Sequence, residues 1–383
     1  MAKSAPILGG SDGSAVDRLV GIDLARGLAV FGMYAAHVGP NPLEGGLVGN
    51  LMEITHGRSS ALFAVLAGFS ILLITGRKAP KSGVAGRQAI ARVAIRGLVL
   101  LALGPILTYL DTRIQVILAY YGICFLLVLP LYRLSAQQLG LLAAATALVL
   151  PQVYFHHESI FAFESSYFDP VLEFMVGGKY PAITWVPFVI AGMAIARLDL
   201  STQAMHWRLG LAGVALAVLG HGGSLLALRL LPGVPAALQE SAFWWSDVGY
   251  PSSWRGTASW YLWVASPHSE TTLSILGGTG CAMIVLAACL LAMDALPDLR
   301  KLVRPIIAVG SMPLTAYVLH IVAISYLLHI VGIDLYGGGS RLSMLFGFIV
   351  LVSTFAVLWL RVFQRGPMEA LIGRIADLAR HIP

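Results

Sequence analysis

The sequence predicts an all-α, polytopic helical membrane protein in which about ten helices cross the bilayer. Charged residues make up 11% of the chain and hydrophobic residues 57%, whereas a water-soluble domain carries about 25% charged residues. Apolar runs recur along the whole chain, so no long polar segment is left to fold in water. These runs are continuous rather than alternating, which excludes a transmembrane β-barrel.

Each expected span is an apolar run close to the length of about 20 residues that a membrane-crossing helix needs. Turn-forming residues such as Gly39-Pro40 separate the runs. The expected spans are 19–38, 54–75, 89–109, 114–132, 137–154, 182–197, 209–231, 272–294, 305–329 and 342–362. The run at 182–197 is the shortest of them and has proline at its flank.

The positions of Lys and Arg orient the chain, because the cytoplasmic loops of membrane proteins carry an excess of cations. With the N-terminus in the cytoplasm, most of the 25 Lys and Arg residues fall on the cytoplasmic side. The cations left on the outer side are Arg58, Arg113, Lys179, Arg229, Arg255 and Arg341. We therefore expect both termini inside: a disordered cytoplasmic tail at 1–17, a single transmembrane domain at 18–365 and a cytoplasmic C-terminal helix at 366–383. We expect a multi-pass protein of the cell membrane, the inner membrane in a bacterium.

The first span carries ionisable residues, and a charge at mid-membrane costs about 2.5–3.5 kcal/mol, so such residues point to function. Asp23 and Arg26 are three residues apart and share a helix face, where they can neutralise each other. Arg26 and His37 are separated by slightly more than three full turns, so they lie on one stripe about 16 Å apart. One helix thus places a cation near the cytoplasm and an imidazole near the far side. The simpler alternative is a membrane anchor with an interfacial histidine.

The second span begins with His56 and Arg58, on the same side of the membrane as His37. A neutral imidazole is a competent base near pH 7, and arginine is a fixed hydrogen-bond donor for an oxyanion. The three residues therefore predict an acid/base site, with a snorkelling Arg58 as the alternative. His268 and Glu270, two residues apart, would point the same way in an extended segment, as a base and its orienting carboxylate do. A solvated loop is the alternative for that pair.

Other candidates within or near the spans are Tyr120, Tyr121, His221, Tyr317 and His320. The sequence has no HExxH motif, no cysteine pair with zinc-site spacing and no phosphate-binding loop. The three cysteines lie inside apolar runs, which argues against a disulfide framework. We therefore expect no metal and no nucleic-acid partner.

Several segments, in order along nearly the whole chain, resemble a known family. The first is Arg18-x4-Asp23-x2-Arg26-Gly27-x4-Gly32, which is similar to the opening helix of the YeiB-like proteins and of the heparan-α-glucosaminide N-acetyltransferase catalytic domain. The others are Ile117 to Gly122, Tyr180-Pro-x3-Trp185-x6-Gly192, Gly310 to His320, and Arg365-Gly-Pro-Met-Glu369. The resemblance implies a ten- or eleven-helix acyltransferase that passes an acyl group from cytoplasmic coenzyme A to an acceptor on the far side.

The resemblance also implies an active histidine. In the lysosomal member, that histidine follows an asparagine. In this chain His37 occupies about the place of the asparagine, and His56 is the next histidine along the chain. His37 and His56 are therefore both candidates for the active residue, with Arg58 beside them. For the anionic coenzyme we assign a cofactor-binding group made of Asp23, Arg26, Arg92, Arg96 and Tyr120. For the acceptor we assign Trp185, His268 and Glu270.

The expected function is transfer of an acyl group, acetyl in the simplest case, from acetyl-CoA or another acyl-CoA to an extracytoplasmic or membrane-embedded glycan, lipid or small molecule. The expected partners are therefore coenzyme A, that acceptor and membrane lipids, and a homodimer stays open. The alternative is a transporter of small molecules or lipids that uses the intramembrane Asp, Arg and His residues as its pathway.

Overall fold

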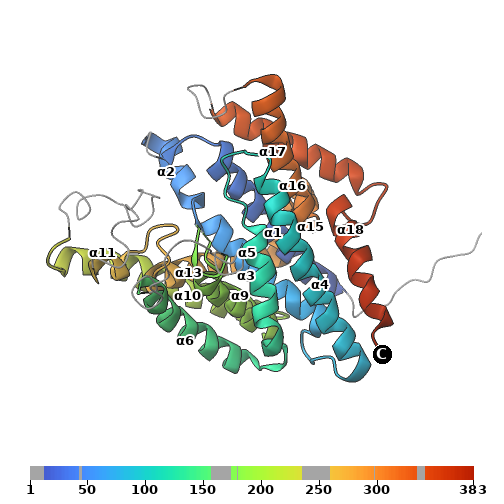
Figure 1. Cartoon of the computed structure of the whole chain (residues 1–383), viewed down its shortest axis with the longest axis horizontal. Helices are drawn as coiled ribbons and strands as arrows, with labels where there is room; N and C mark the ends of the chain where they lie inside the picture. The colour runs from blue at the N-terminus through green and yellow to red at the C-terminus, as the bar shows by residue number, and fades with distance from the viewer. Residues whose placement is uncertain are drawn as a thin grey trace, which may run out of the picture.

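A computed structural model describes residues 13–42, 45–156, 174–178, 180–234, 259–296, 298–333 and 341–383. Within these ranges the regular structure is entirely helical (Figure 1), which confirms the all-α part of the predicted fold class. Seven helical segments are long and apolar enough to cross a membrane, judged by length and composition. They are Gly46–Thr75, Gly83–Thr108, Ala136–Phe155, Gln203–Leu230, Thr272–Ala295, Pro313–Val331 and Arg341–Trp359. Two shorter apolar helices cover Leu118–Arg133 and Ala182–Arg197.

The helices follow the order of the expected spans. The first half contains α1 (Gly13–Val38), α2 (Gly46–Thr55), α3 (Arg58–Thr75), α4 (Gly83–Thr108), α5 (Leu118–Val128) with the 3₁₀ turn η2 (Leu129–Arg133), α6 (Ala136–Phe155) and α9 (Ala182–Arg197). Next come α10 (Gln203–Ala217), the π-helical turn η3 (Val218–Gly222), α11 (Gly223–Leu230), η5 (Ser259–Trp263) and α13 (Thr272–Ala295). The last part contains α14 (Leu299–Leu302), α15 (Arg304–Ser311), α16 (Pro313–Tyr326), η6 (Leu327–Val331), α17 (Arg341–Trp359), α18 (Pro367–Ala376) and η7 (Asp377–His381).

The first helix starts earlier than expected. Residues 13–17, which the sequence places in a disordered tail, belong to α1, while residues 1–12 lie outside the described part of the chain. The expected C-terminal helix is present as α18, which lies beside α4 (Figure 1).

The expected second span is interrupted. Gly57 separates α2 from α3 and has a φ of 68°, a left-handed conformation that favours glycine. A Cβ at Gly57 would also lie 2.5 Å from the Cβ of Pro267. The break places His56 and Arg58 beside the segment that precedes α13, rather than inside a continuous helix.

The expected ninth span is also two helices. α15 ends at Ser311 and α16 begins at Pro313, because proline has no N–H to give to a continuing helix and is well suited to a first turn. This break exposes the N-terminal N–H groups of α16, which matter for the site described below.

Helix α1 packs against α3, α13 and α15. Its contact with α15 is made by backbones: a Cβ at Gly310 would lie 1.7 Å from the carbonyl oxygen of Asp23, and a Cβ at Gly27 would lie 2.2 Å from that of Ile306. Small residues allow such close approach between membrane helices. The ionisable stripe of α1 is therefore held in the interior of the helix assembly.

Candidate functional site

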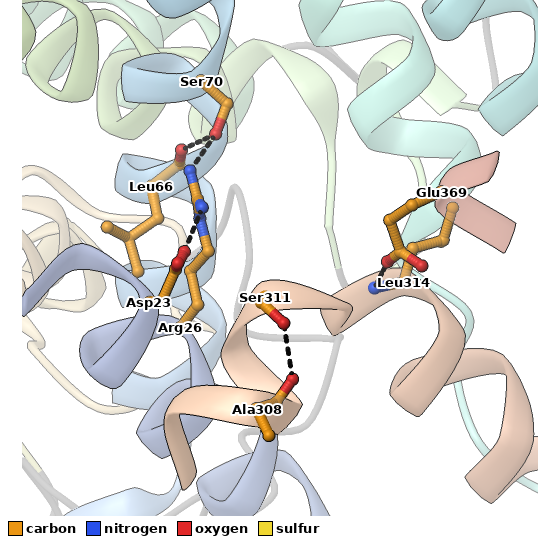
Figure 2. A network of polar contacts seen from close by, with 8 residues as sticks. All are labelled: Asp23, Arg26, Leu66, Ser70, Ala308, Ser311, Leu314 and Glu369. Carbon is orange, nitrogen blue, oxygen red and sulfur yellow. Dashed lines mark hydrogen bonds and ion pairs between the residues drawn. The ribbon is translucent and has the colours of Figure 1, made fainter. Parts of the chain in front are cut away.

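Arg26 is fixed from two sides (Figure 2). Its Nη1 donates to Asp23 Oδ1 at 2.8 Å, and its Nη2 donates to Ser70 Oγ on α3, also at 2.8 Å. The hydroxyl of Ser70 in turn donates to the carbonyl of Leu66, so its lone pairs face the guanidinium. The Asp23–Arg26 ion pair expected from their spacing is present, with both side chains largely buried.

Arg26 lines a cavity of about 390 Å³ that we call the basic cavity. Three arginines, Arg26, Arg96 and Arg365, come to it from α1, α4 and the segment before α18. Its other lining residues are Phe63, Leu66, Ala67, Ser70, Ile74, Leu100, Leu118, Tyr121, Phe125, Ser311, Pro313, Leu314, Glu369 and Ile372. The buried Nε of Arg96 has no hydrogen-bond partner among the described residues. The cavity therefore combines cations with an apolar wall.

Glu369 of α18 holds one wall of the basic cavity in place (Figure 2). Its Oε1 accepts from the backbone N–H groups of Leu314, at 2.8 Å, and Thr315, at 3.2 Å. Its Oε2 accepts from the hydroxyl of Thr315 at 2.5 Å. A carboxylate is favourable at a helix N-terminus, where N–H groups lack partners within the helix. The α15–α16 break thus provides the anchor for the C-terminal helix.

His37, at the other end of the α1 stripe, lines a second cavity of about 190 Å³, which we call the histidine cavity. The cavity also contains His56 and His268, together with Ser59, Ser60, Ile117 and Tyr317 on its walls. The Nδ1 of His37 lies 2.9 Å from the Nε2 of His320, which is buried on α16.

A smaller side pocket, about 30 Å³, adjoins the histidine cavity, and both are lined by His56, Gly57 and His268. The rest of its polar and aromatic lining is Arg58, Trp185, Phe188, His221, Glu270 and Ser274. The structure therefore brings together the residues that the sequence assigned to catalysis and to the acceptor, although they come from α1, the turn between α2 and α3, α3, α9 and the segment before α13.

Glu270 is buried in this side pocket. Its carboxylate accepts from the hydroxyl of Thr184, and it accepts from Trp185 Nε1 at 3.2 Å. The expectation of an extended backbone here is wrong: His268 and Glu270 have φ values of 57° and 62°, in the left-handed region. Non-glycine residues there carry strain of about 1–3 kcal/mol each, which tends to occur at functional sites. The two left-handed residues place the His268 ring 6.0 Å from Trp185 and the carboxylate against α9.

Three residues assigned to the coenzyme do not line the basic cavity: Tyr120, Arg92 and Asp23, which pairs with the neighbouring Arg26. Tyr120 packs edge-on against Phe174 and lines a different cavity with Gly178. Its neighbour Tyr121 lines the basic cavity instead, because successive helix residues point about 100° apart. Arg92 lies one turn before Arg96 on α4 but does not line the basic cavity.

An aromatic layer, formed by Phe63 and Tyr121, lies where the basic cavity and the histidine cavity approach each other. The two rings are stacked with centroids 5.7 Å apart, and the Tyr121 hydroxyl donates to the carbonyl of Ser60 at 3.0 Å. Both rings line the basic cavity, whereas Ser60 on α3 and Ile117, the residue before α5, line the histidine cavity. The cavities are thus arranged in series along α1, with this layer between them.

A cation-bearing cavity in series with a histidine cavity suits the transfer of a group from an anionic donor to an acceptor. A family model described as the catalytic domain of heparan-alpha-glucosaminide N-acetyltransferase matches residues 18–226, more than half of the chain. The chain belongs to this family. A second model, described as a protein of unknown function (DUF418), matches residues 248–378 and supports the YeiB-like resemblance. A search of curated proteins and a search of solved structures gave no match.

As a member of the heparan-α-glucosaminide N-acetyltransferase catalytic family, the chain belongs to a group of membrane acetyltransferases. Its arrangement includes residues to which the sequence assigned no role. Ser70, Arg365 and Glu369 line the basic cavity, and His320, which was a candidate without an assigned role, pairs with His37. For Glu369 the sequence held one indication, the segment Arg365-Gly-Pro-Met-Glu369. A proline followed by an acid is typical of the first turn of a helix.

Proposed function

We propose that this protein transfers an acetyl or other acyl group from acyl-CoA to a hydroxyl or amine acceptor. The observation that carries the proposal is the pair of cavities along one helix: α1 lines the basic cavity at Arg26 and the histidine cavity at His37. About 16 Å of helix separates the two residues. In this proposal the donor binds in the basic cavity and the base lies in the histidine cavity. The acyl group of the donor therefore has to reach or pass the aromatic layer between the two cavities.

The basic cavity provides what coenzyme A requires. Its phosphates are anions, and Arg26, Arg96 and Arg365 offer guanidinium groups that match phosphate geometry. The Nε of Arg96, which has no partner among the described residues, is a donor available to such a ligand. Beyond the arginines the wall becomes apolar and aromatic, at Phe63 and Tyr121, which suits the less polar arm that carries the thioester.

The reaction needs a base for the acceptor. In the proposed sequence, His37 takes the proton from the acceptor hydroxyl or amine, and the acceptor oxygen or nitrogen attacks the thioester carbonyl. The C–S bond then breaks, and His37 passes the proton that it took from the acceptor to the coenzyme thiolate. The products are the acylated acceptor and free coenzyme A. His56 and Arg58, from the adjoining side pocket, supply further donors for the oxyanion that forms during attack.

The acceptor is proposed to enter the side pocket. The rings of Trp185 and His268 line it, and the Glu270 carboxylate accepts hydrogen bonds. Rings beside a buried carboxylate favour an acceptor with both an apolar face and hydroxyl or amine groups. Glycans, lipid head groups and small molecules all include such compounds.

The test is direct. Wild-type protein purified in detergent should bind coenzyme A saturably in calorimetry and should release free thiol from radiolabelled acetyl-CoA when amine, sugar and lipid acceptors are supplied. Folded protein that shows no coenzyme A binding at millimolar concentration would overturn the proposal. That result would favour the transporter alternative instead.

A further inference from the structure

We propose that His320 is a positioning residue that holds His37 in the tautomer able to act as a base; this inference rests on the proposed acyl transfer. The Nδ1 of His37 and the Nε2 of His320 are 2.9 Å apart. Their ring planes are nearly parallel, at 10°, and the centroids are 5.2 Å apart, a separation that suits an in-plane N–H···N hydrogen bond between two rings lying edge to edge. The two histidines come from α1 and α16, which are far apart in the sequence.

His320 is held firmly. It is 2% exposed, and its ring lies between Tyr34, with centroids 4.7 Å apart, and Tyr317, at 5.0 Å. The Tyr34 hydroxyl donates to the carbonyl of Ala316 at 2.7 Å, which ties α1 to α16 one turn before His320. The Tyr317 hydroxyl accepts from the backbone N–H of Ile117. These contacts restrict the movement of the His320 ring beside His37.

The rings in contact with His320 are those of His37, Tyr34 and Tyr317, and among these described neighbours no carboxylate is present to pair with a cation. A charge in such surroundings is strongly disfavoured, so His320 is neutral. A neutral imidazole has one N–H and one lone pair. Of the two histidines, one must therefore donate and the other accept.

Two arrangements are available. If Nδ1–H of His37 donates to His320, the Nε2 of His37 keeps a lone pair and can take a proton. If His320 donates instead, the Nε2 of His37 is already protonated and cannot act as a base. The two arrangements also differ at the Nδ1 of His320, which carries a proton in the first and a lone pair in the second. Hydrogen bonds of this ring to the backbone oxygens of Tyr317 and Ala316 favour the proton. We assign the first arrangement because it alone supports base catalysis by His37.

This arrangement parallels the general use of a hydrogen-bonded partner to orient a catalytic imidazole. Here the partner is a neutral histidine rather than a carboxylate. After His37 takes the acceptor's proton, both of its nitrogens carry protons, and Nδ1–H still donates to His320. That charge-assisted hydrogen bond stabilises the imidazolium until the proton passes to the coenzyme thiolate.

Kinetics of variants provide one test. His320→Leu should lower kcat about 10²-fold through misplacement of His37, with KM for acetyl-CoA unchanged. His320→Gln, whose amide oxygen can accept near the Nε2 position, should keep most of the activity. The double variant His37→Ala/His320→Leu should be no slower than His37→Ala alone, because His320 acts through His37. The control is His329→Leu, an exposed histidine later in the same helical run, which should behave as wild type.

A wild-type kcat in His320→Leu, or losses that multiply in the double variant, would overturn the assignment and leave His320 a packing residue. Wild-type protein that consumes no acetyl-CoA would instead contradict the proposed function. ¹⁵N NMR of histidine-labelled wild-type protein tests the hydrogen bond without any turnover. The expected spectrum shows His37 protonated at Nδ1 and bare at Nε2, and the opposite tautomer would overturn the inference even if all variants fold poorly.

Discussion

Arg26 is restrained by Asp23 on its own helix and by Ser70 on α3. A guanidinium that is already fixed loses little side-chain freedom when it binds a phosphate. Its paired carboxylate also lowers the cost of placing a cation within the helix assembly. Arg96 has no comparable partner at its Nε. The two arginines therefore contribute differently: one is positioned in advance, and the other has a donor left for the ligand.

Replacing Arg26 or Arg96 by alanine should weaken coenzyme A binding about 10- to 100-fold, since a hydrogen bond to a charged group contributes about 1.5–3 kcal/mol. Calorimetry with purified protein measures this directly. Arg208→Ala is the matched control, because this exposed arginine on α10 lines none of the cavities described above. Unchanged affinity in both cavity variants would contradict the placement of the coenzyme.

His37→Ala should fold and bind coenzyme A but transfer acetyl groups about 10²–10⁴-fold more slowly, the usual effect of losing a general base. His56→Ala should cause a smaller loss, because His56 lies at the border of the histidine cavity and the side pocket. Single-turnover transfer from labelled acetyl-CoA separates the two effects. Transfer at the wild-type rate in His37→Ala would remove this residue from the mechanism.

At this scale the sequence predicted contacts along one helix well. Helical spacing was enough to place Asp23 beside Arg26, and the structure contains that ion pair. Helical spacing was not enough to decide whether Tyr120 or Tyr121 lines the basic cavity, because that depends on which helices pack around α5. His320 shows the same limit: its partner lies on a helix nearly 300 residues earlier, and no local pattern reports such a pairing.

At the scale of elements, the breaks in helices position the site. The α2–α3 break brings His56 and Arg58 to the side pocket, and the α15–α16 break offers N–H groups to Glu369. The sequence predicted continuous spans at both places, because a single glycine or proline hardly changes the hydropathy of a long apolar run. The close contact between Gly57 and Pro267 is a tertiary contact between residues far apart in the sequence, and local composition cannot predict it.

Glu369→Ala should loosen α18, because it removes the acceptor for two backbone N–H groups and one hydroxyl at the start of α16. Loss of a helix cap costs about 0.5–2 kcal/mol. Hydrogen–deuterium exchange should show faster exchange in α18 and in the first turn of α16. Arg374→Ala, an exposed position of the same helix, is the control, and equal exchange in the two variants would rule out the anchoring role.

At the scale of the whole molecule, the distribution of cations predicts a cytoplasmic loop between α3 and α4. Gly83 has a φ of 57°, so the neighbouring exposed Ser82 is the better position for a probe. In a background without the native cysteines, Ser82→Cys should resist a membrane-impermeant maleimide in intact cells and react after permeabilisation. Leu47→Cys, at the exposed start of α2, should react from outside. Labelling of Ser82→Cys in intact cells would reverse the orientation.

The tight backbone contact between α1 and α15 bears on how such a protein can change over time. Gly27 lies within the sequence matched by one family model and Gly310 within the other, and neither position has room for a larger side chain. The two matched segments are therefore not interchangeable modules. A gene that exchanged its second half with a distant relative would have to inherit a complementary surface for α1, and with it a partner for His37.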